Sequence, residues 1–341
     1  MNGRVTICVP IYRGKRFLEE TLRSIVAQTR RDFDVVMSLD EPDPACEAIC
    51  RRFLDDPRFK LVIQPERLGW VGNFNWIMAR VETEFCYYHQ QDDLTDPTYV
   101  EILVGHLREH PSAALAYCDL LPMGRIAGAF KQVPSVLGVT PYMRLMTMLH
   151  EHYGAFAFRG MVRAEAARRA GPVPTNAVDD FGVDICWLAA VARAGELHHV
   201  PAPLYRKRYH DDNTESKWWA WPLEKKLEAW PHHCVDMLNQ AFAVGGTVEE
   251  MRLMWLAGVE RLTSPRTARP FLGTSELSAE QRGRMFDRFM AVATASKVRD
   301  IPVLLDDGWP GIAEWTRRFL RTPAPGPIEI VAFGPRRVEA A

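Results

Sequence analysis

The first half of the chain alternates short apolar runs with segments in which apolar residues recur at helical spacing. The run at 5–10 is rich in β-branched residues and ends at a proline, which predicts a strand, and the periodic segment 17–28 predicts a helix. The same alternation predicts strands at 33–39, 59–63, 84–88 and 113–118 and helices at 44–54, 70–81 and 97–109. Strands joined by crossover helices form a mostly parallel sheet with helices on both faces, so we expect an α/β fold.

The pattern changes after residue 120. A Gly- and Pro-rich stretch extends to Pro141 and precedes predicted helices at 142–150 and 184–194 and a predicted strand at 197–208. From about Lys217 onward the apolar spacing is largely helical, with predicted helices at 223–242, 247–262, 280–295 and 311–320. We therefore expect one domain at 1–215 with halves at 1–120 and 121–215, a helical region at 216–321, and a tail at 322–341 that is partly disordered or packs as an edge strand.

Composition narrows the class of protein. The 341 residues include 42 basic and 43 acidic side chains, so no net field would hold nucleic acid by charge alone. No apolar run approaches the ~20 residues of a membrane span, and the N-terminal residues lack a signal-peptide hydrophobic segment, which predicts a cytoplasmic protein. The seven scattered cysteines, never in a CxxC pair, indicate neither a disulfide framework nor a zinc site. The Trp218–Trp221 cluster is open to two interpretations, a contact with a partner or membrane interface and a seam between domains.

Polar residues follow three of the predicted parallel strands, at positions that would meet at one edge of the sheet. They are Tyr12 and Arg13 after the first strand, Asp40 and Glu41 after the second, and Asp92 and Asp93 after the fourth. A carboxylate after the second strand is well placed to bind a ribose or a base, and adjacent carboxylates suit a divalent cation that shares its ligands with phosphate oxygens. Any one such pair taken alone is more often part of a solvated turn or a helix N-cap.

The order and spacing of five segments resemble glycosyltransferase family 2, whose members use nucleotide sugars and have the GT-A fold. The segments are the strand 5–12 ending in Pro-x-Tyr, LRSIVAQTRRDFD at 22–34, the turn 38–43, GWVGNFN at 69–75 and FCYYHQQDDLTDP at 85–97. The resemblance covers residues 4–215 and implies a GT-A catalytic domain in which 1–120 binds the nucleotide and 121–215 carries the acceptor site and the base.

The resemblance implies a nucleotide site and a metal site. Asp40 would contact the base or ribose, and Asp92 would hold Mg²⁺ or Mn²⁺ against the donor diphosphate. The implied nucleotide-sugar pocket comprises Pro10, Tyr12, Arg13, Asp40, Asn75, Gln90, Gln91, Asp93, Arg206 and Arg208. Gln90 departs from the family, which usually has an aspartate there, and a neutral amide removes one negative charge from the metal site. Gln90 would instead bond the donor ribose or sugar.

The later segments resemble the family's catalytic half. Inverting transfer needs a general base that takes the acceptor proton, and the segment 179–184 resembles the family's base motif with an altered register. Asp180 is the leading candidate, followed by Asp179 and Asp184, and a helix-capping role is the alternative for at least one of the three. The ending Tyr-x-x-Arg-x-His at 205–210 implies that Arg206 or Arg208 neutralises the leaving diphosphate and that His210 is a second metal ligand. Arg159 and Gly160, after the aromatic run 153–158, belong to the acceptor-side loop or to a core strand.

The expected function is thus an inverting glycosyltransferase that uses a UDP, GDP or dTDP sugar donor and a glycan or lipid-linked hydroxyl acceptor in polysaccharide or glycolipid biosynthesis. The processive members' Gln-x-x-Arg-Trp motif and membrane helices are missing, which favours one transfer per acceptor, with peripheral contact to the inner face of the membrane as an open interpretation of the Trp cluster. A degenerate domain that binds nucleotide sugar without turnover is the main alternative, because of Gln90. A sugar-nucleotide nucleotidyltransferase is disfavoured, because the loop after the first strand has only Gly14 where a glycine-rich phosphate loop is required.

Overall fold

The computed structural model describes residues 4–125, 134–151, 154–273 and 276–296. Its core is one eight-stranded sheet in the order β3-β2-β1-β4-β7-β6-β8-β5. The strands are β1 (Val5–Ile11), β2 (Phe33–Leu39), β3 (Phe59–Ile63), β4 (Phe85–Tyr88), β5 (Leu94–Thr95), β6 (Ala113–Gly124), β7 (Met161–Arg163) and β8 (Glu196–Tyr209). The predicted α/β fold with a central sheet is confirmed.

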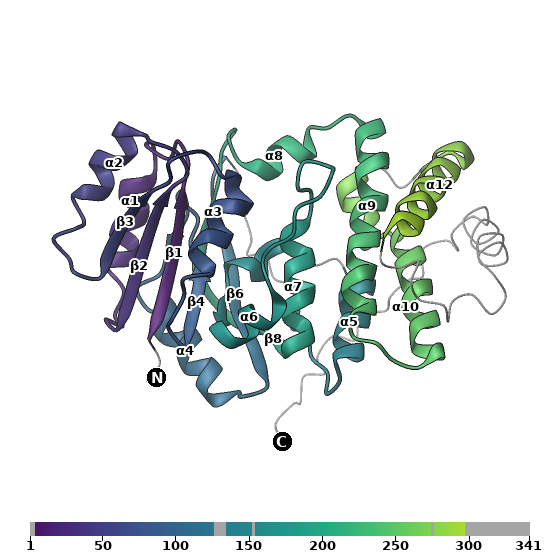
Figure 1. Ribbon diagram of the computed structural model, residues 1–341, viewed down its shortest axis with the longest axis horizontal. Helices are drawn as coiled ribbons and strands as arrows, with labels where there is room; N and C mark the ends of the chain where they lie inside the picture. Colours follow the sequence, from purple (N-terminus) through teal and green to yellow (C-terminus); the bar gives the residue numbers. More distant parts are fainter. Residues whose placement is uncertain (1–3, 126–133, 152–153, 274–275, 297–341) are drawn as a thin grey trace, which may run out of the picture.

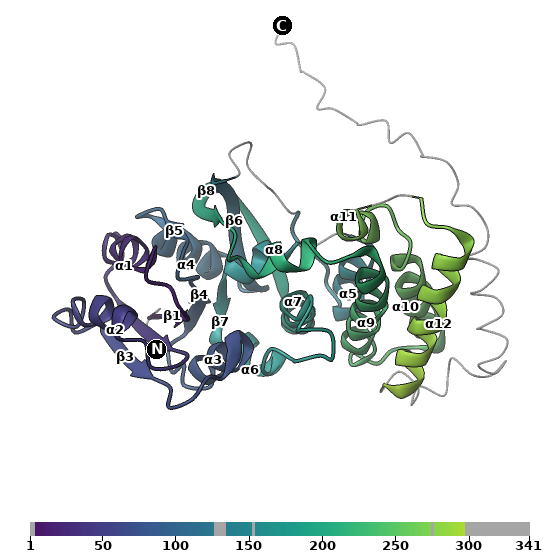
Figure 2. The same ribbon diagram turned by 90° about the horizontal axis from the view of Figure 1, so that it is seen from above.

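The first four strands form the parallel part of the sheet. β1 lies between β2 and β4, all seven of its residues are buried, and β2 also pairs with β3 in parallel. The crossover helices α1 (Leu18–Val26), α2 (Pro44–Arg51) and α4 (Tyr99–Glu109) bury their apolar residues in one core with these strands. Helix α3 (Gly69–Met78) lies on the opposite face, as Figure 2 shows. The carboxyl ends of β1, β2 and β4 therefore meet at one edge of the sheet, as expected.

The other part of the sheet contains both kinds of pairing: β6 and β8 pair in parallel, as predicted, whereas two short strands pair antiparallel. The short strand β7 lies antiparallel between β4 and β6, and β5 is antiparallel to β8. The sequence analysis missed both because each has three residues or fewer and depends on partners far away in the chain. The segment Ala155–Arg159 is a 3-10 helix, so the alternative of a core strand there is wrong. Tyr153 lies outside the described residues.

Three further helices cover the sheet on the same face as α3. They are α5 (Pro141–His150), α6 (Ala164–Ala170) and α7 (Val183–Ala194), and they share a core with α3. Three of the strand and helix predictions, β2, β3 and α9, match the structure residue for residue, and α1 begins within one residue of its predicted start. Helix α6 was not predicted.

Within the described residues, five helices follow the sheet: α8 (Thr214–Trp219), α9 (Leu223–Phe242), α10 (Val248–Arg261), α11 (Ala268–Leu272) and α12 (Ala279–Ala295). Figure 1 shows α8 leading from the sheet to this helical region, where α9 packs against α5, α7, α10 and α12. The buried guanidinium of Arg261 donates to the carbonyl oxygens of Met148 and Leu149 at 3.1 and 2.9 Å, so α10 caps the carboxyl end of α5. The predicted helix 311–320 and the tail 322–341 lie outside the described residues.

Two further observations concern the whole described chain. Among its helices, none is both long enough and apolar enough to cross a membrane. The seven cysteines are all free and buried.

Candidate active site

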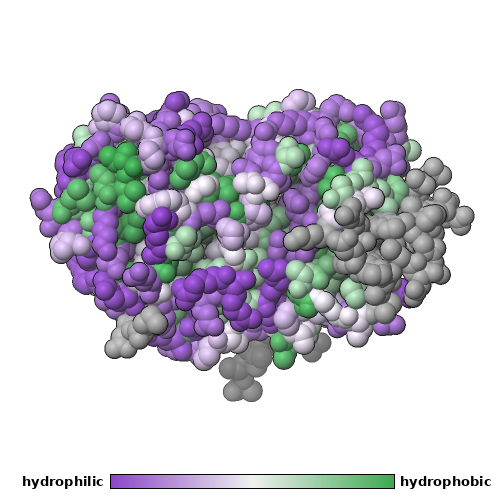
Figure 3. Space-filling model, viewed as in Figure 1, coloured by the Kyte–Doolittle hydropathy of each residue, from purple (hydrophilic) through white to green (hydrophobic). Residues whose placement is uncertain are grey.

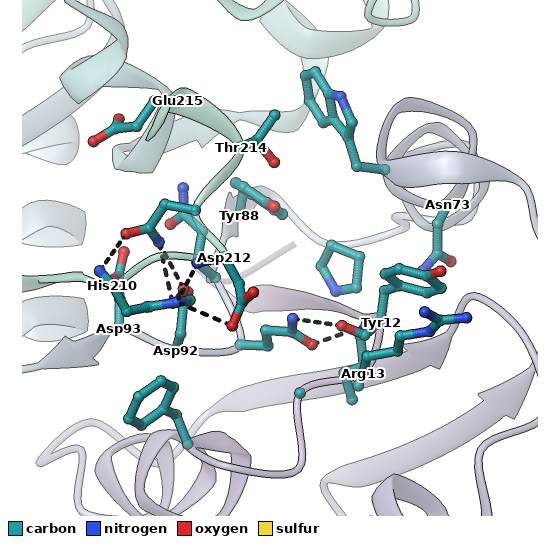
Figure 4. A pocket seen from close by; sticks show the side chains of 18 of the residues that line it. Tyr12, Arg13, Asn73, Tyr88, Asp92, Asp93, His210, Asp212, Thr214 and Glu215 are labelled. Atoms are coloured by element: carbon teal, nitrogen blue, oxygen red, sulfur yellow. Dashed lines mark hydrogen bonds and ion pairs between the residues drawn. The ribbon is translucent and has the colours of Figure 1, made fainter. Parts of the chain in front are cut away.

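A cavity of about 560 Å³ lies at the carboxyl ends of the parallel strands and extends toward α7 and α8. Ten of the predicted site residues line it: Pro10, Tyr12, Arg13, Asp40, Gln90, Gln91, Asp92, Asp93, Asp184 and His210. Five others do not line it: Asn75, Asp179, Asp180, Arg206 and Arg208. Figure 4 shows Asp92 and His210 on one side of the cavity and Tyr12 and Arg13 on the other.

Asp40 is held at the end of β2 against the start of α3. Its two carboxylate oxygens accept hydrogen bonds from the backbone N–H groups of Leu68 and Gly69, at 2.9 and 3.1 Å. These N–H groups lie at the start of the helix and fix the orientation of the carboxylate. Asp40 is buried, yet its oxygens keep lone pairs that can accept from a ribose hydroxyl or a base N–H.

Tyr12 forms a flat wall beside Asp40. The guanidinium groups of Arg67 and Arg13 lie 4.3 and 5.0 Å from the centre of its ring, and Arg67 is also 3.9 Å from Asp40. The side chain of Gln91 fixes this loop, because it accepts from the backbone N–H of Tyr12 and donates to its carbonyl oxygen, both at 2.8 Å. Gln91 therefore positions Tyr12.

Asp92 and His210 come together at the centre of the site. Nε2 of His210 lies 2.6 Å from Oδ2 of Asp92, and the amide of Asn213 donates to the same oxygen at 3.1 Å. One carboxylate oxygen and one imidazole nitrogen are two of the ligand types that Mn²⁺ accepts, whereas Mg²⁺ prefers oxygen alone. Among the described residues no group of three or more His, Cys, Asp or Glu could hold a metal ion, so further ligands would have to come from the donor diphosphate and water.

Asp93 is a buried support of this centre. One of its oxygens accepts from the backbone N–H of Arg208 at 2.7 Å, and the other accepts from the hydroxyl of Tyr205 at 3.0 Å and faces Arg159 at 3.4 Å. Burial, and next the charge of Asp92, raise the pKa of Asp93 to about 6. Because both oxygens are already engaged, Asp93 lies in the wall as a positioning group.

Gln90 is engaged by the same wall. Tyr205 has one hydroxyl proton, which goes to Asp93, so its oxygen accepts from the amide nitrogen of Gln90 at 2.5 Å. In that orientation the amide oxygen of Gln90 accepts from Nε and Nη2 of Arg159 at 3.1 and 3.0 Å. A neutral amide suits this place because it both donates and accepts.

Arg159 and Lys207 also line the cavity, although neither was predicted to belong to the nucleotide site. Arg159 is held by Gln90 and Asp93. Lys207 is buried on β8 and forms an ion pair with Glu215 of α8. Burial lowers the pKa of Lys207 to about 8. The cavity therefore offers positive charge from the protein itself.

The neighbouring arginines of β8 lie elsewhere. Arg206 is exposed, because alternate residues of a strand face opposite sides and Lys207 takes the inward side. Arg208 donates from Nε to the carbonyl oxygen of Asp92 at 2.9 Å and from Nη2 to Glu20 at 2.6 Å. Arg208 thus holds the loop of Asp92. Contrary to the prediction, neither Arg206 nor Arg208 lines the cavity.

The predicted base segment places only Asp184 in the cavity. Asp179 is exposed and pairs with Lys225 at 2.5 Å, and Asp180 accepts from the backbone N–H of Asn176 at 3.1 Å. Both have positive φ angles of 54°, and neither lines the cavity. Burial raises the pKa of Asp184 above its ordinary value. Asp180, the leading candidate for the general base in the sequence analysis, therefore lies outside the cavity wall.

Asn75 also lies away from the expected place. Its amide makes two hydrogen bonds with the backbone of Val173, at 2.8 and 2.9 Å, on the side of α3 remote from the cavity. Asn73, two residues earlier, lines the cavity instead, together with Trp70. The sequence offered only the helical spacing of these residues as a signal.

Comparison with known proteins agrees with this architecture. Residues 6–119 match the family model described as Glycosyl transferase family 2. Glycosyltransferase GlyA of Streptococcus pneumoniae is 26% identical over 110 residues, which cover 32% of this chain but only 16% of that protein. An uncharacterized glycosyltransferase of Haemophilus influenzae is 21% identical over 228 residues, which cover 62% of this chain and 67% of the relative.

Two solved structures share the fold. S. aureus TarS 1-349 in complex with UDP-GlcNAc aligns with a TM-score of 0.64 at 12% identity and covers 93% of this chain and 89% of that one. The mannosyltransferase PcManGT from Pyrobaculum calidifontis, in complex with GDP-Man and Mn²⁺, aligns with a TM-score of 0.53 at 16% identity and covers 93% and 84%. The fold is thus that of the GT-A glycosyltransferases, and the family match over residues 6–119 agrees with it. The match to the family 2 model over residues 6–119 agrees with the resemblance that the sequence motifs predict.

Proposed function

We propose that the protein is an inverting glycosyltransferase that moves a sugar from a nucleotide diphosphate donor to a hydroxyl acceptor. The observation that carries the proposal is that one cavity is lined by Asp40, by the Asp92–His210 pair and by Asp184. These are a nucleotide-binding carboxylate, a pair of metal ligands and a carboxylate base, which are the three groups that metal-assisted sugar transfer requires.

The donor nucleoside would lie between Tyr12 and Asp40. The tyrosine ring offers a stacking surface and the carboxylate accepts from the ribose or base. The fold relatives in complex with UDP-GlcNAc and GDP-Man support a nucleotide sugar of the UDP, GDP or dTDP type. The diphosphate would then point toward Asp92 and His210, across the cavity in Figure 4.

Asp92 and His210 would hold a divalent cation, with Mn²⁺ fitting the mixed oxygen and nitrogen ligands better than Mg²⁺. When bound, such a cation neutralises the charge that develops on the departing diphosphate. The Mn²⁺ in the complex of the fold relative PcManGT supports this assignment. Lys207 and Arg159 also line the cavity and would supply further positive charge to the donor diphosphate, so less of that charge would have to come from a cation.

Asp184 is the proposed general base. It lines the cavity at the first turn of α7, whereas Asp179 and Asp180 are turned away and bound to Lys225 and Asn176. A raised pKa brings a carboxylate closer to the proton affinity that base catalysis near neutral pH needs.

In the proposed reaction, Asp184 takes the proton of the acceptor hydroxyl while the acceptor oxygen attacks the anomeric carbon. The bond from that carbon to the diphosphate oxygen breaks on the opposite face, so the configuration at the carbon inverts. The bonding electrons leave with the nucleoside diphosphate, whose charge is neutralised at the Asp92–His210 side. Arg159 stays paired with Asp93 and keeps the wall in place.

Our proposals for the acceptor, the cellular location and the domain division rest on the sequence. The acceptor is a glycan or a lipid-linked precursor, and one sugar is added per acceptor. Seven free, buried cysteines support a reducing compartment, in agreement with a cytoplasmic enzyme that acts at the inner face of the membrane. We also propose the division into a catalytic domain at 1–215 and a helical region that starts with α8.

A second candidate, nucleotide-sugar binding without turnover, is favoured by one observation. Gln90 is fully engaged by Tyr205 and Arg159, so this position offers no charge to a cation. The two candidates make the same prediction for nucleotide binding and differ in whether sugar is released.

The test is an assay of purified protein with UDP-GlcNAc, GDP-mannose and dTDP-glucose, each with Mn²⁺, glycan acceptors and a lipid-linked acceptor. Nuclear magnetic resonance of the product reports release of nucleoside diphosphate and the anomeric configuration. The proposal predicts release from one donor with inverted configuration in the product. Retained configuration contradicts the inverting mechanism, and binding of a nucleotide without any release establishes the second candidate.

A further inference from the structure

A second cavity, of about 310 Å³, lies between α3, α6 and α7. Its walls are mostly apolar and include Phe74, Met78, Val81, Ala164, Ala167 and Trp187. Two polar groups of the wall are satisfied within the protein. Asn75 bonds to the backbone of Val173, and Nε1 of Trp187 donates to the carbonyl oxygen of Gly171 at 2.9 Å. An occupant of the interior would thus meet mainly hydrocarbon and aromatic surface.

One charged residue, Arg168, belongs to the wall of this cavity. It is exposed on α6, and none of the residues in the described ranges forms an ion pair with it. A free guanidinium beside an apolar cavity is complementary to a molecule with a hydrocarbon chain and an anionic head.

The second cavity is separate from the candidate active site, although only one aromatic layer divides them. The ring of Phe74 lies 5.1 Å from that of Tyr88 and 5.3 Å from that of Phe158, and Phe158 lies 5.4 Å from Trp187. Phe74 and Trp187 line the second cavity, while Tyr88 and Phe158 line the first. A molecule in one cavity therefore does not occupy the other.

We propose that this second cavity binds the alkyl chain of a single-chain anionic amphiphile, such as a fatty acid, with its carboxylate paired to Arg168. The chain length that fits is short because the cavity is small for a lipid with two chains. Figures 1 and 2 place α3 and α6 on the face that Figure 3 displays, and that face is mostly polar with separate apolar patches. A free amphiphile, taken up one molecule at a time, suits such a face better than a bilayer does.

The experiment is isothermal titration calorimetry of the full chain with decanoate below its micellar concentration. We expect saturable binding of one molecule per chain. Arg168→Gln should weaken binding about threefold, the size expected of one exposed ion pair, whereas the matched control Arg169→Gln on the next position of α6 should not change it. Ala167→Leu, which fills the cavity from a buried position, should abolish binding, and circular dichroism checks that this variant folds.

Three further arms decide the outcome. Decanol, which lacks the charge, should bind about threefold more weakly than decanoate, in parallel with Arg168→Gln. Excess UDP or GDP with Mn²⁺ should not displace decanoate; displacement would place the probe in the candidate active site and overturn the proposal. Vesicles of phosphatidylglycerol should bind no more strongly to the wild type than to Arg168→Gln. Absence of saturable binding, or equal affinity in the wild type, Arg168→Gln and Ala167→Leu, overturns the proposal independently of the proposed transferase activity.

Discussion

Nε2 of His210 lies 2.6 Å from Oδ2 of Asp92, although the two residues are 118 positions apart in the chain. The contact arises because β5, directly after Asp92 and Asp93, pairs antiparallel with the last part of β8, with Leu94 opposite Arg206. This pairing brings the end of β8 next to the loop that follows β4. The short strand β5, which has no strong sequence signal, is what assembles the proposed metal site.

The first prediction separates two aspartates of the proposed base segment. Asp184→Asn keeps the size of the side chain but removes the proton acceptor, so kcat should fall about 10²- to 10⁴-fold. Asp180→Asn, the matched control, should leave kcat within about threefold, because Asp180 faces the loop of Asn176. Steady-state kinetics with the best donor measures both, and calorimetry with the nucleotide checks that binding is intact. A large loss in Asp180→Asn with full activity in Asp184→Asn would return the role of base to Asp180.

The second prediction concerns pH and Lys207, whose pKa burial lowers to about 8. Nucleotide diphosphate binding should weaken as the pH rises through about 8, since the lysine loses its charge there. Lys207→Arg should keep its affinity up to higher pH, because arginine stays protonated. Calorimetric titrations between pH 6.5 and 9.5 measure the difference. If both proteins show the same pH profile, Lys207 does not contact the diphosphate.

Lys207 also affects the stability of the fold, and here a rise in pH has the opposite effect: it strengthens the fold while it weakens nucleotide binding. The pKa of Lys207 in the folded protein is below the ordinary value of 10.5, so the unfolded chain binds this proton more strongly. Its charged form therefore costs stability below about pH 8, and that cost disappears as the pH rises from about 8 to 10.5. The free energy of unfolding of the wild type should rise relative to that of Lys207→Met across this window, as urea denaturation at each pH would show.

The third prediction concerns the turn that leads into α7. Gly182 has φ 68°, and a Cβ at this position would lie 2.6 Å from Nδ1 of His233 on α9. Gly245 has φ 71° and open space around the same point, so it is a matched control for the backbone strain alone. Both alanine substitutions should cost about 1–2 kcal/mol of strain, and Gly182→Ala should cost about 1–3 kcal/mol more for the clash.

Urea denaturation of the two glycine variants gives the comparison. Equal losses of unfolding free energy would mean that His233 moves aside freely and that α9 does not hold the loop before Asp184. A larger loss in Gly182→Ala, together with a lower kcat, would show that the helical region supports the proposed base.

The accuracy with which the sequence predicts secondary structure differs between regions of the chain. The strands β2 and β3 and the helix α9 were predicted to the residue, because their hydrophobic patterns are regular and long enough to stand alone. β7 could not be predicted, since its three residues are a strand only through pairing with β4 and β6. Helix α6 was missed although its alanine-rich sequence favours a helix, because the segment lacks a clear apolar period.

The candidate site shows the same division. Asp92 and His210 stand in recognisable motifs, and the sequence was sufficient to place them in one site. The ranking of Asp180 over Asp184 failed to anticipate the left-handed residues of the loop, since φ is not visible in a run of acidic residues. The motif at 205–210 indicates Arg206 and Arg208 rather than Lys207, although in a strand the side chain of Lys207 faces the opposite side from those of its two neighbours.

The central claim, a metal-assisted nucleotide site built on Asp92 and His210, is tested most directly by calorimetric titration of UDP and GDP with and without Mn²⁺. In the wild type, Mn²⁺ should strengthen the binding of one nucleotide by about tenfold or more, which corresponds to about 1.4 kcal/mol. Asp92→Ala and His210→Ala should each lose this increment and keep the affinity measured without metal. An unchanged Mn²⁺ increment in both variants, or no nucleotide binding to the wild type, would contradict the account.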